Sequence, residues 1–357
     1  MGHKATALVC LLAAGVLLAA GLPLHAESPC PPKVQSELLV TMPDYVNTPD
    51  GMCLLPSGDI LVSCPNINDQ SQPAVIMKVT PDNKAELFCR PPVHPDTGKA
   101  YPFGICVGPR GDVYYADLQW FADPENPNYK SRVMRIPMDG GKPGEAVVFA
   151  SGMVVANAVV VRGGYLYVSD TIMVPGTDPL VTGVFRFELE EESVALTRPL
   201  QKDPHVLVTT ETENVEIGFG ADGLTFDSQG NLYIADFADG VIRKVTFDKD
   251  MNPRRPKLFA KAPFMKSCDG IFCDVTTDRI YVADSMANAV QVVYPDGKVC
   301  TLAQDPESDG TDGRMDQPCE VLLRGDEIII SNFDFPVPGG VNTKFEVPNT
   351  ICRIPLN

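Results

Sequence analysis

The stretch ADGLTFDSQGNLYIAD, residues 221–236, decides the fold. It holds two short runs of β-favouring residues, 224–226 and 232–234, on either side of the turn-forming segment DSQGN. The same plan of strand, turn and strand recurs along the chain. Its six copies begin at Pro49, Pro102, Ala156, Ala221, Cys268 and Cys319. An internal repeat of this kind indicates one structural unit used many times.

The repeat predicts an all-β fold. The second residues of successive copies are 47 to 65 residues apart, which leaves room for two further strands in each copy. Candidates for them are AVIMKVT (74–80) and AELFCR (85–90) after the first copy, and similar pairs follow most of the others. Six four-stranded antiparallel units at this NHL-like period predict a six-bladed β-propeller.

The two ends of the chain complete one blade together. The last copy is followed only by TICRIPLN (350–357), which matches a third strand and leaves no sequence for a fourth. SELLVTMP (36–43) resembles the fourth strands and is expected to close the ring. Such closure removes two open sheet edges. We therefore expect residues 27–357 to form a single propeller domain.

The first 26 residues have the plan of a secretory signal peptide. Lys4 precedes an apolar run from residue 5 to 22, and Leu24-His25-Ala26 forms a small-residue cleavage site. An uncleaved anchor is the alternative. Cleavage predicts a secreted or periplasmic protein and removes Lys4, which changes the formal charge from −17 to −18. This acidity disfavours nucleic acid and anionic membranes as partners. The sequence leaves the oligomeric state open.

The first strand of each blade lines the central channel, so residues at its start should meet in a ring. The ring residues are Asp50, Phe103, Asn157, Asp222, Asp269 and Glu320. Carboxylates brought together raise each other's pKa unless a cation compensates them. Oxygen ligands favour calcium, with magnesium next, and leave manganese or zinc as further options. The four carboxylates and the Asn157 amide are therefore candidate ligands of a divalent cation, with Asp269 and Glu320 as supporting carboxylates.

Simpler interpretations remain for several of these residues. Asp-Gly pairs, as at Asp50, Asp222 and Asp269, are also turn formers. Repeated aspartates end the second strands and are interpreted as caps of the loops that follow; they are Asp117, Asp170, Asp236 and Asp284. Cys268 and Cys319 each precede a ring residue, where a disulfide could join adjacent blades.

Residues 221–245 resemble the fourth-blade motif of the family of gluconolactonase, senescence marker protein and luciferin-regenerating enzyme. The resemblance implies that Asp222 is both a metal ligand and the catalytic base, that Asn157 is a ligand, and that Asp50 takes the place of a glutamate ligand. Two positions depart from the family pattern. Ala158 replaces a glycine, and Phe103 replaces an asparagine that holds substrate.

The resemblance implies metal-dependent hydrolysis of a small-molecule lactone or ester, with Asp222 activating water. Phe103, Trp120 and Phe121 would contribute to the substrate pocket, and loops 118–131, 171–182 and 333–349 would surround the mouth. The main alternative is a non-catalytic propeller that binds a ligand or partner and keeps a divalent cation for structure. A condensing enzyme or lyase similar to strictosidine synthase is a third hypothesis, which rests on the fold alone. Whether the protein is an enzyme stays open at this point.

Overall fold

The computed structural model of the chain describes residues 1–2, 30–125 and 128–356. The chain divides into two units, Met1–Cys30 and Pro31–Asn357. Apart from Met1 and Gly2, the predicted signal peptide lies outside the described residues, so cleavage after Ala26 stays a prediction. No helix within the described ranges is long and apolar enough to cross a membrane.

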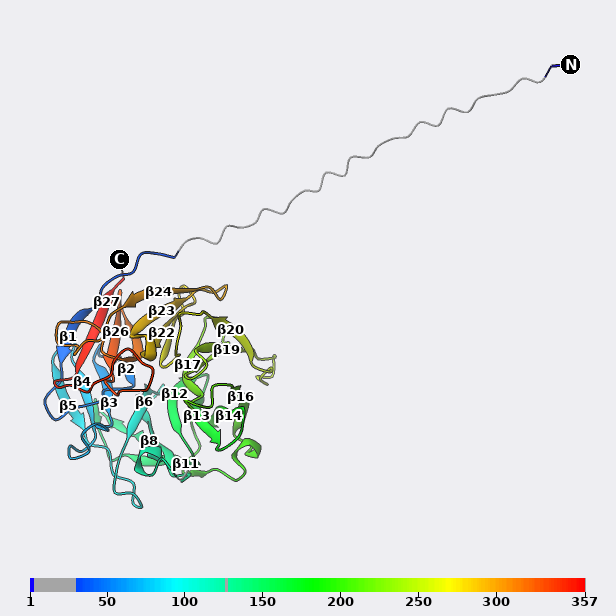
Figure 1. Cartoon of the computed structure of the whole chain (residues 1–357). Helices are drawn as coiled ribbons and strands as arrows, with labels where there is room; N and C mark the ends of the chain where they lie inside the picture. The colour runs from blue at the N-terminus through cyan, green and yellow to red at the C-terminus, as the bar shows by residue number, and fades with distance from the viewer. Residues whose placement is uncertain (3–29, 126–127, 357) are drawn as a thin grey trace. The chain divides into compact units, whose positions relative to one another are not determined.

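The larger unit is a six-bladed β-propeller, as predicted (Figure 1). Four antiparallel strands form the main sheet of each blade. Blade one consists of β2 (Met52–Leu54), β3 (Ile60–Cys64), β4 (Val75–Val79) and β5 (Ala85–Cys89). Blade two consists of β6 (Pro102–Val107), β7 (Val113–Asp117), β8 (Ser131–Ile136) and β11 (Val147–Met153). Blade three consists of β12 (Ala156–Arg162), β13 (Tyr165–Val174), β14 (Leu180–Glu188) and β16 (Val206–Thr212).

Blades four to six have the same arrangement. Blade four consists of β17 (Ala221–Phe226), β18 (Leu232–Asp236), β19 (Val241–Val245) and β20 (Lys257–Lys261). Blade five consists of β21 (Ile271–Asp274), β22 (Arg279–Asp284), β23 (Ala289–Val293) and β24 (Val299–Gln304). Blade six consists of β25 (Pro318–Arg324), β26 (Glu327–Asn332), β27 (Thr350–Pro355) and β1 (Glu37–Thr41). The smaller elements are the hairpin β9 (Met138–Asp139) and β10 (Lys142–Pro143), the short strand β15 (Val194–Ala195), which extends blade two, and the 3-10 helices η1 (Gln119–Ala122), η2 (Leu200–Lys202) and η3 (Ser285–Ala287).

The N-terminal strand closes the ring, which confirms the prediction from SELLVTMP. Strand β1 pairs antiparallel with β27, with Glu37 opposite Arg353 and Thr41 opposite Thr350. The Arg353 guanidinium reaches the Glu37 carboxylate at 2.9 Å. Figure 1 shows the blue start of the domain beside its red end. Because β1 covers the edge of β27, blade six does not present that edge to another chain.

The inner strands are irregular at the ring positions. The pairing of β6, β12 and β17 with the next strand skips residues after Pro102, Ala156 and Ala221. Phe103, Asn157 and Asp222 lie in these irregular segments, and bulges of this kind turn a side chain away from its regular direction. Asp50, Phe103, Asn157, Asp222 and Asp269 therefore occupy equivalent positions at the start of the inner strands. The expectation for Glu320 is wrong: β25 skips Cys319 after Pro318 and pairs Glu320 with Ser331, so Cys319 takes the ring position of blade six and Glu320 lies one residue beyond it.

Glycines after the ring residues let neighbouring inner strands approach each other. A Cβ added to Gly104 would lie 2.5 Å from the Asn157 carbonyl oxygen and 2.7 Å from the Ala158 Cα. A Cβ on Gly51 would lie 2.7 Å from the Gly104 Cα. The Asp-Gly interpretation as ordinary turns is therefore wrong for Asp50, because its glycine packs against the backbone of the next blade.

We expect Gly104→Ala to destabilise the propeller by about 1–3 kcal/mol, because the added methyl group overlaps the backbone of blade three. Ala158→Gly is the matched control, since it empties the equivalent position of the next blade, and should cost at most about 1 kcal/mol. Chemical denaturation of both variants measures the difference. A Gly104→Ala protein as stable as wild type would contradict this packing.

Candidate functional site

The ring residues form one end of a pocket in the propeller. A cavity of about 290 Å³ is lined by Asp50, Phe103, Asn157, Asp222 and Asp269. Asp50 and Asp222 are 8% and 7% exposed, and Asn157 and Asp269 are partly accessible from the cavity. Glu320 lies outside the pocket wall, although its charge acts on Asp269. Five of the six expected ring residues therefore line one pocket, and Cys319 lines it where Glu320 was expected.

The ring carboxylates are buried and act on one another. Burial raises the pKa of Asp50 to about 7. Burial also raises the pKa of Asp222, and the charges of Asp50 and Asp236 add to the increase, while a hydrogen bond from the Asn157 side chain opposes it. The pKa values of Asp269 and Glu320 are raised by burial first and then by the other ring carboxylates. No Lys, Arg or His is among the causes of these four pKa shifts, so the negative charge of the ring carboxylates is uncompensated.

This donor set suits a hard divalent cation. Carboxylate and amide oxygens are the ligands that calcium and magnesium prefer. The Asn157 amide contacts Asp222, and Asp50 acts electrostatically on Asp222, so the three expected ligands are neighbours. Among the ring carboxylates, no three have ligand atoms that all lie within 4.8 Å of one another. In the described part of the chain, the one group of three acidic residues that meets this distance consists of Asp316, Asp334 and Glu346. A cation in the ring would depend on the Asn157 amide.

Aromatic side chains form the pocket wall above the ring. Phe103 stacks on Phe121 at 5.6 Å between ring centroids, and Trp120 meets Phe121 edge to face at 5.2 Å. Phe333 contacts Phe103, and Phe335 contacts Phe121. The expected pocket residues Phe103, Trp120 and Phe121 thus all line the cavity. The result is an apolar chamber with a polar, acidic end.

The loop expectations have mixed outcomes. Loops 118–131 and 333–349 contribute Leu118 and residues 335–338 to the pocket wall. The expectation for 171–182 is wrong: β13 runs on to Val174 and β14 begins at Leu180, and this hairpin contributes no residue to the cavity. The pocket instead includes Glu216, Ile217 and Phe219 from the segment before β17. The sequence signal for them was weak, because they precede the repeated motif.

The repeated aspartates at the ends of the second strands are structural. Asp170 accepts hydrogen bonds from the backbone N–H groups of Val154, Val155 and Ile172. Asp117 accepts one from the Tyr101 N–H at 2.8 Å. These bonds hold the segment that enters the inner strand of the same blade as well as the loop that follows. The capping interpretation is confirmed for Asp170 and Asp236, which accept bonds from the N–H groups of Ile172 and Asp239 in the loops that follow. For Asp117 and Asp284 the backbone hydrogen bonds come from the preceding segment instead.

The cysteines near the ring are not joined to each other. Cys268 and Cys319 are both free and buried, so the disulfide suggested by their positions does not form. The Cys319 thiol lies 3.4 Å from the Pro49 carbonyl oxygen and 3.3 Å from the Ser331 hydroxyl. Its Sγ also lies at the pocket wall beside Asp50. Cys319 therefore holds the ring position of blade six, next to the expected metal ligands.

Comparison with known proteins supports the fold. No protein-family model and no curated protein matches the sequence. A gluconolactonase from Xanthomonas campestris is 14% identical over 93% of this chain and 99% of its own, with a TM-score of 0.56. Luciferin-regenerating enzyme is 11% identical over 86% and 91%, with a TM-score of 0.58.

A sugar dehydrogenase has a comparable likeness. The PQQ-bound aldose sugar dehydrogenase from Streptomyces coelicolor is 17% identical over 91% of this chain and 99% of its own, with a TM-score of 0.59. Identities this low carry information about architecture and none about chemistry. The chain therefore shares the six-bladed propeller fold of gluconolactonase and luciferin-regenerating enzyme, the two proteins whose family its sequence resembles.

Proposed function

We propose that this protein is a metal-dependent hydrolase that opens a lactone or ester carrying an apolar group, and that it works in the periplasm or outside the cell. The observation that carries the proposal is the pocket: uncompensated carboxylates and one amide at its inner end, and aromatic rings along its wall. A carbonyl group would meet the polar end, and an apolar substituent would fill the chamber.

A divalent cation, calcium first, would be held by Asp50, Asn157 and Asp222. When bound, the cation supplies Lewis acidity and charge stabilisation for an oxyanion. The residues present fit such an ion because they offer only oxygen ligands and carry negative charge without a basic neighbour. Asp269 and Glu320 would add to the negative potential that attracts a cation to this end of the pocket.

Asp222 is the group that would move the proton. Its carboxylate would accept a proton from water as the water oxygen bonds to the substrate carbonyl carbon. The carbon–oxygen bond to the leaving alkoxide then breaks, and Asp222 returns the proton to that oxygen. Burial raises the pKa of Asp222, which brings a carboxylate closer to the range in which general bases work best at neutral pH.

The wall of the pocket favours apolar substrates over sugar lactones. Phe103 occupies the position of an asparagine in the family that the sequence resembles. Its ring stacks on Phe121 and offers no hydrogen bond to a substrate. Burying the hydroxyl groups of a sugar against these rings would leave them without partners. Alkyl-substituted lactones and aryl esters match the chamber better.

A hydrolysis screen tests the proposal. The purified protein is stripped with a chelator and reloaded with calcium, magnesium, manganese or zinc. It is then assayed by pH-stat against alkyl γ- and δ-lactones, aryl esters and glucono-δ-lactone. We expect calcium-dependent turnover, faster with the alkyl lactones than with the sugar lactone. Absence of turnover with every cation would favour the alternative, a ligand-binding propeller, which the apolar Phe103 also fits.

We expect Phe103→Asn to lower kcat/KM for an alkyl lactone about tenfold, mainly through KM, since the loss of aromatic contact is worth about 1–2 kcal/mol. Phe103→Leu is the control, because it keeps an apolar side chain and should lose less. Steady-state kinetics on both variants, with melting temperatures to verify folding, provide the measurement. Equal kinetics for Phe103→Asn and wild type would place the substrate elsewhere.

A further inference from the structure

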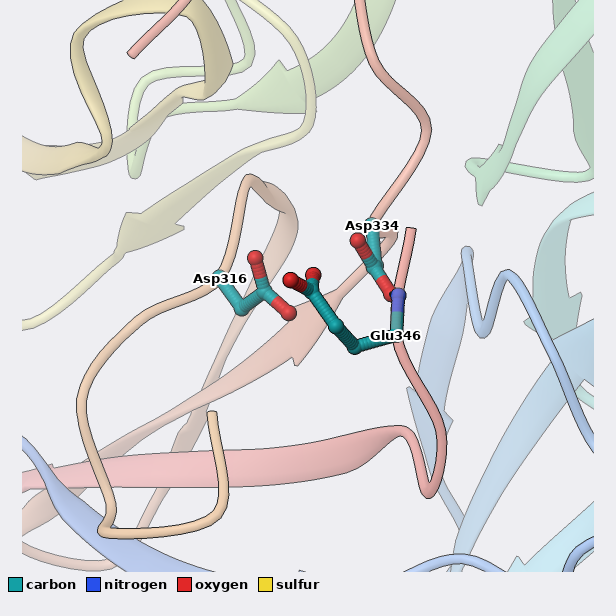
Figure 2. Close-up of side chains that lie close together, drawn as sticks. All are labelled: Asp316, Asp334 and Glu346. Carbon is teal, nitrogen blue, oxygen red and sulfur yellow. The ribbon is translucent and has the colours of Figure 1, made fainter. Parts of the chain in front are cut away.

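A second acidic cluster lies in the loops of blade six, apart from the ring. Asp316 precedes β25, and Asp334 and Glu346 belong to the connection between β26 and β27. Figure 2 shows the three carboxylates directed toward a common space. Their ligand oxygens all lie within 4.8 Å of one another. Two oxygens bound to one calcium ion at 2.3–2.6 Å can be up to about 5 Å apart, so this spacing fits one ion.

Two buried asparagines lie at the cluster with unused oxygens. The Asn342 side-chain N–H group donates to Asp316 Oδ1, and the Asn349 side-chain N–H group donates to Asp334 Oδ2 at 3.2 Å. Both asparagines are 3% exposed, and neither Oδ1 atom has a hydrogen-bond partner. A half-turn of each amide exchanges its oxygen and nitrogen, so either oxygen can turn toward the carboxylates.

Asp334 adds a third unpartnered oxygen. Its side chain is 1% exposed, and its Oδ1 atom has no hydrogen-bond partner. The charged groups that act on Asp316 are all acidic, namely Glu346, Asp309 and Glu307. Buried oxygens without donors, in a cluster of like charges, are costly unless an ion satisfies them.

We infer that Asp316, Asp334 and Glu346, with the amide oxygens of Asn342 and Asn349, form a calcium site that is separate from the ring. Five protein oxygens from two loops match calcium, which accepts six to eight oxygens in irregular geometry, better than magnesium, which requires a regular octahedron. Water would complete the coordination.

The ion would fix one wall of the substrate pocket. Residues 333–349 connect β26 to β27, and Phe333, Phe335 and Pro336 of this segment line the cavity. Asp334 lies between two of these wall residues, so a bond from its carboxylate to the ion would hold the wall against the loop that carries Asp316. The site thus shapes the pocket without taking part in the reaction.

Trypsin offers a direct test, because Lys344 is the only basic residue in segment 333–349 and it is exposed. Cleavage after Lys344 requires the segment to open. In the full-length protein, calcium at ten times its Kd should slow this cleavage about tenfold, as followed by mass spectrometry. Magnesium at the same concentration should protect less; equal protection would overturn the assignment to calcium.

Three variants locate the effect. Glu346→Gln and Asp334→Asn should lose the calcium protection, whereas the exposed Asp250→Asn should keep it. Glu346 is partly exposed, so its variant should fold, and circular dichroism verifies this. Calcium protection of Glu346→Gln equal to that of wild type, or no protection of wild type, would overturn the inference.

Equilibrium dialysis with radioactive calcium separates this site from the ring. Glu346→Gln should lose one bound calcium per chain, whereas Asp222→Asn should keep the protection of Lys344. If the lactone screen shows no turnover, these results still stand, because the blade-six site does not depend on catalysis. Unchanged calcium stoichiometry in Glu346→Gln would contradict the site.

Discussion

Asp222→Asn is expected to lower kcat for lactone hydrolysis at least 100-fold, within the range of about 10²–10⁴ that a general base contributes. The amide has nearly the shape of the carboxylate, but it cannot accept the proton of water. It is also a weaker ligand for a divalent cation. The measurement is kcat at saturating calcium, with Asp250→Asn as an exposed control of equal charge change.

The same variant should remain folded. Asp222 is buried, and its pKa is raised by burial and by the charges of Asp50 and Asp236, so a neutral side chain relieves repulsion in the metal-free protein. We therefore expect its melting temperature without calcium to be equal to or above that of wild type. Turnover within threefold of wild type would exclude Asp222 as the base.

The second large effect is a pH dependence of stability that calcium reverses. Burial raises the pKa of Asp50 from 3.8 to about 7, and the pKa values of Asp222, Asp269 and Glu320 are raised too. A carboxyl with a raised pKa binds protons more tightly in the folded state than in the unfolded state. The free energy of unfolding of the metal-free protein should therefore fall as pH rises from about 4 to 7.

For Asp50 alone the loss is on the order of a few kcal/mol, because each pKa unit corresponds to about 1.4 kcal/mol. Calcium binds the deprotonated carboxylates, so its stabilising effect should grow over the same pH range. Melting curves at pH 5 and pH 8, with and without calcium, make the comparison. In Glu346→Gln, which removes a ligand of the second site, the remaining effect of calcium on the pH profile reports binding at the ring. Identical pH profiles with and without calcium would contradict this account.

The blades and their closure were predictable because a propeller repeats its signal. Each inner strand begins at an equivalent position, so the register of Asp50, Asn157 and Asp222 in the sequence carries over directly into a ring in space. The pairing of β1 with β27 was predicted from the likeness of SELLVTMP to the fourth strands of the other blades. Phe103 was identified in the same way, by its place in the register.

Other features could not be predicted because they depend on contacts between irregular segments. Phe219 and Glu216 reach the pocket from the connection between β16 and β17, which lies outside the repeated motif. Asp316 and Glu346 are brought together by loops whose paths the repeat does not define. The segment 171–182 has the Pro and Gly content of a loop, yet most of it continues β13 and β14, because each strand finds pairing partners along its length.

The most direct test of the central claim, a divalent cation held by the ring, is anomalous X-ray diffraction from crystals grown with manganese in place of calcium. The account predicts a peak in contact with Asp50, Asn157 and Asp222, and its loss in crystals of Asp222→Asn. A map with no peak at the ring, while a peak appears among Asp316, Asp334 and Glu346, would show that manganese reached the protein but did not bind there. That result would contradict the proposed catalytic site.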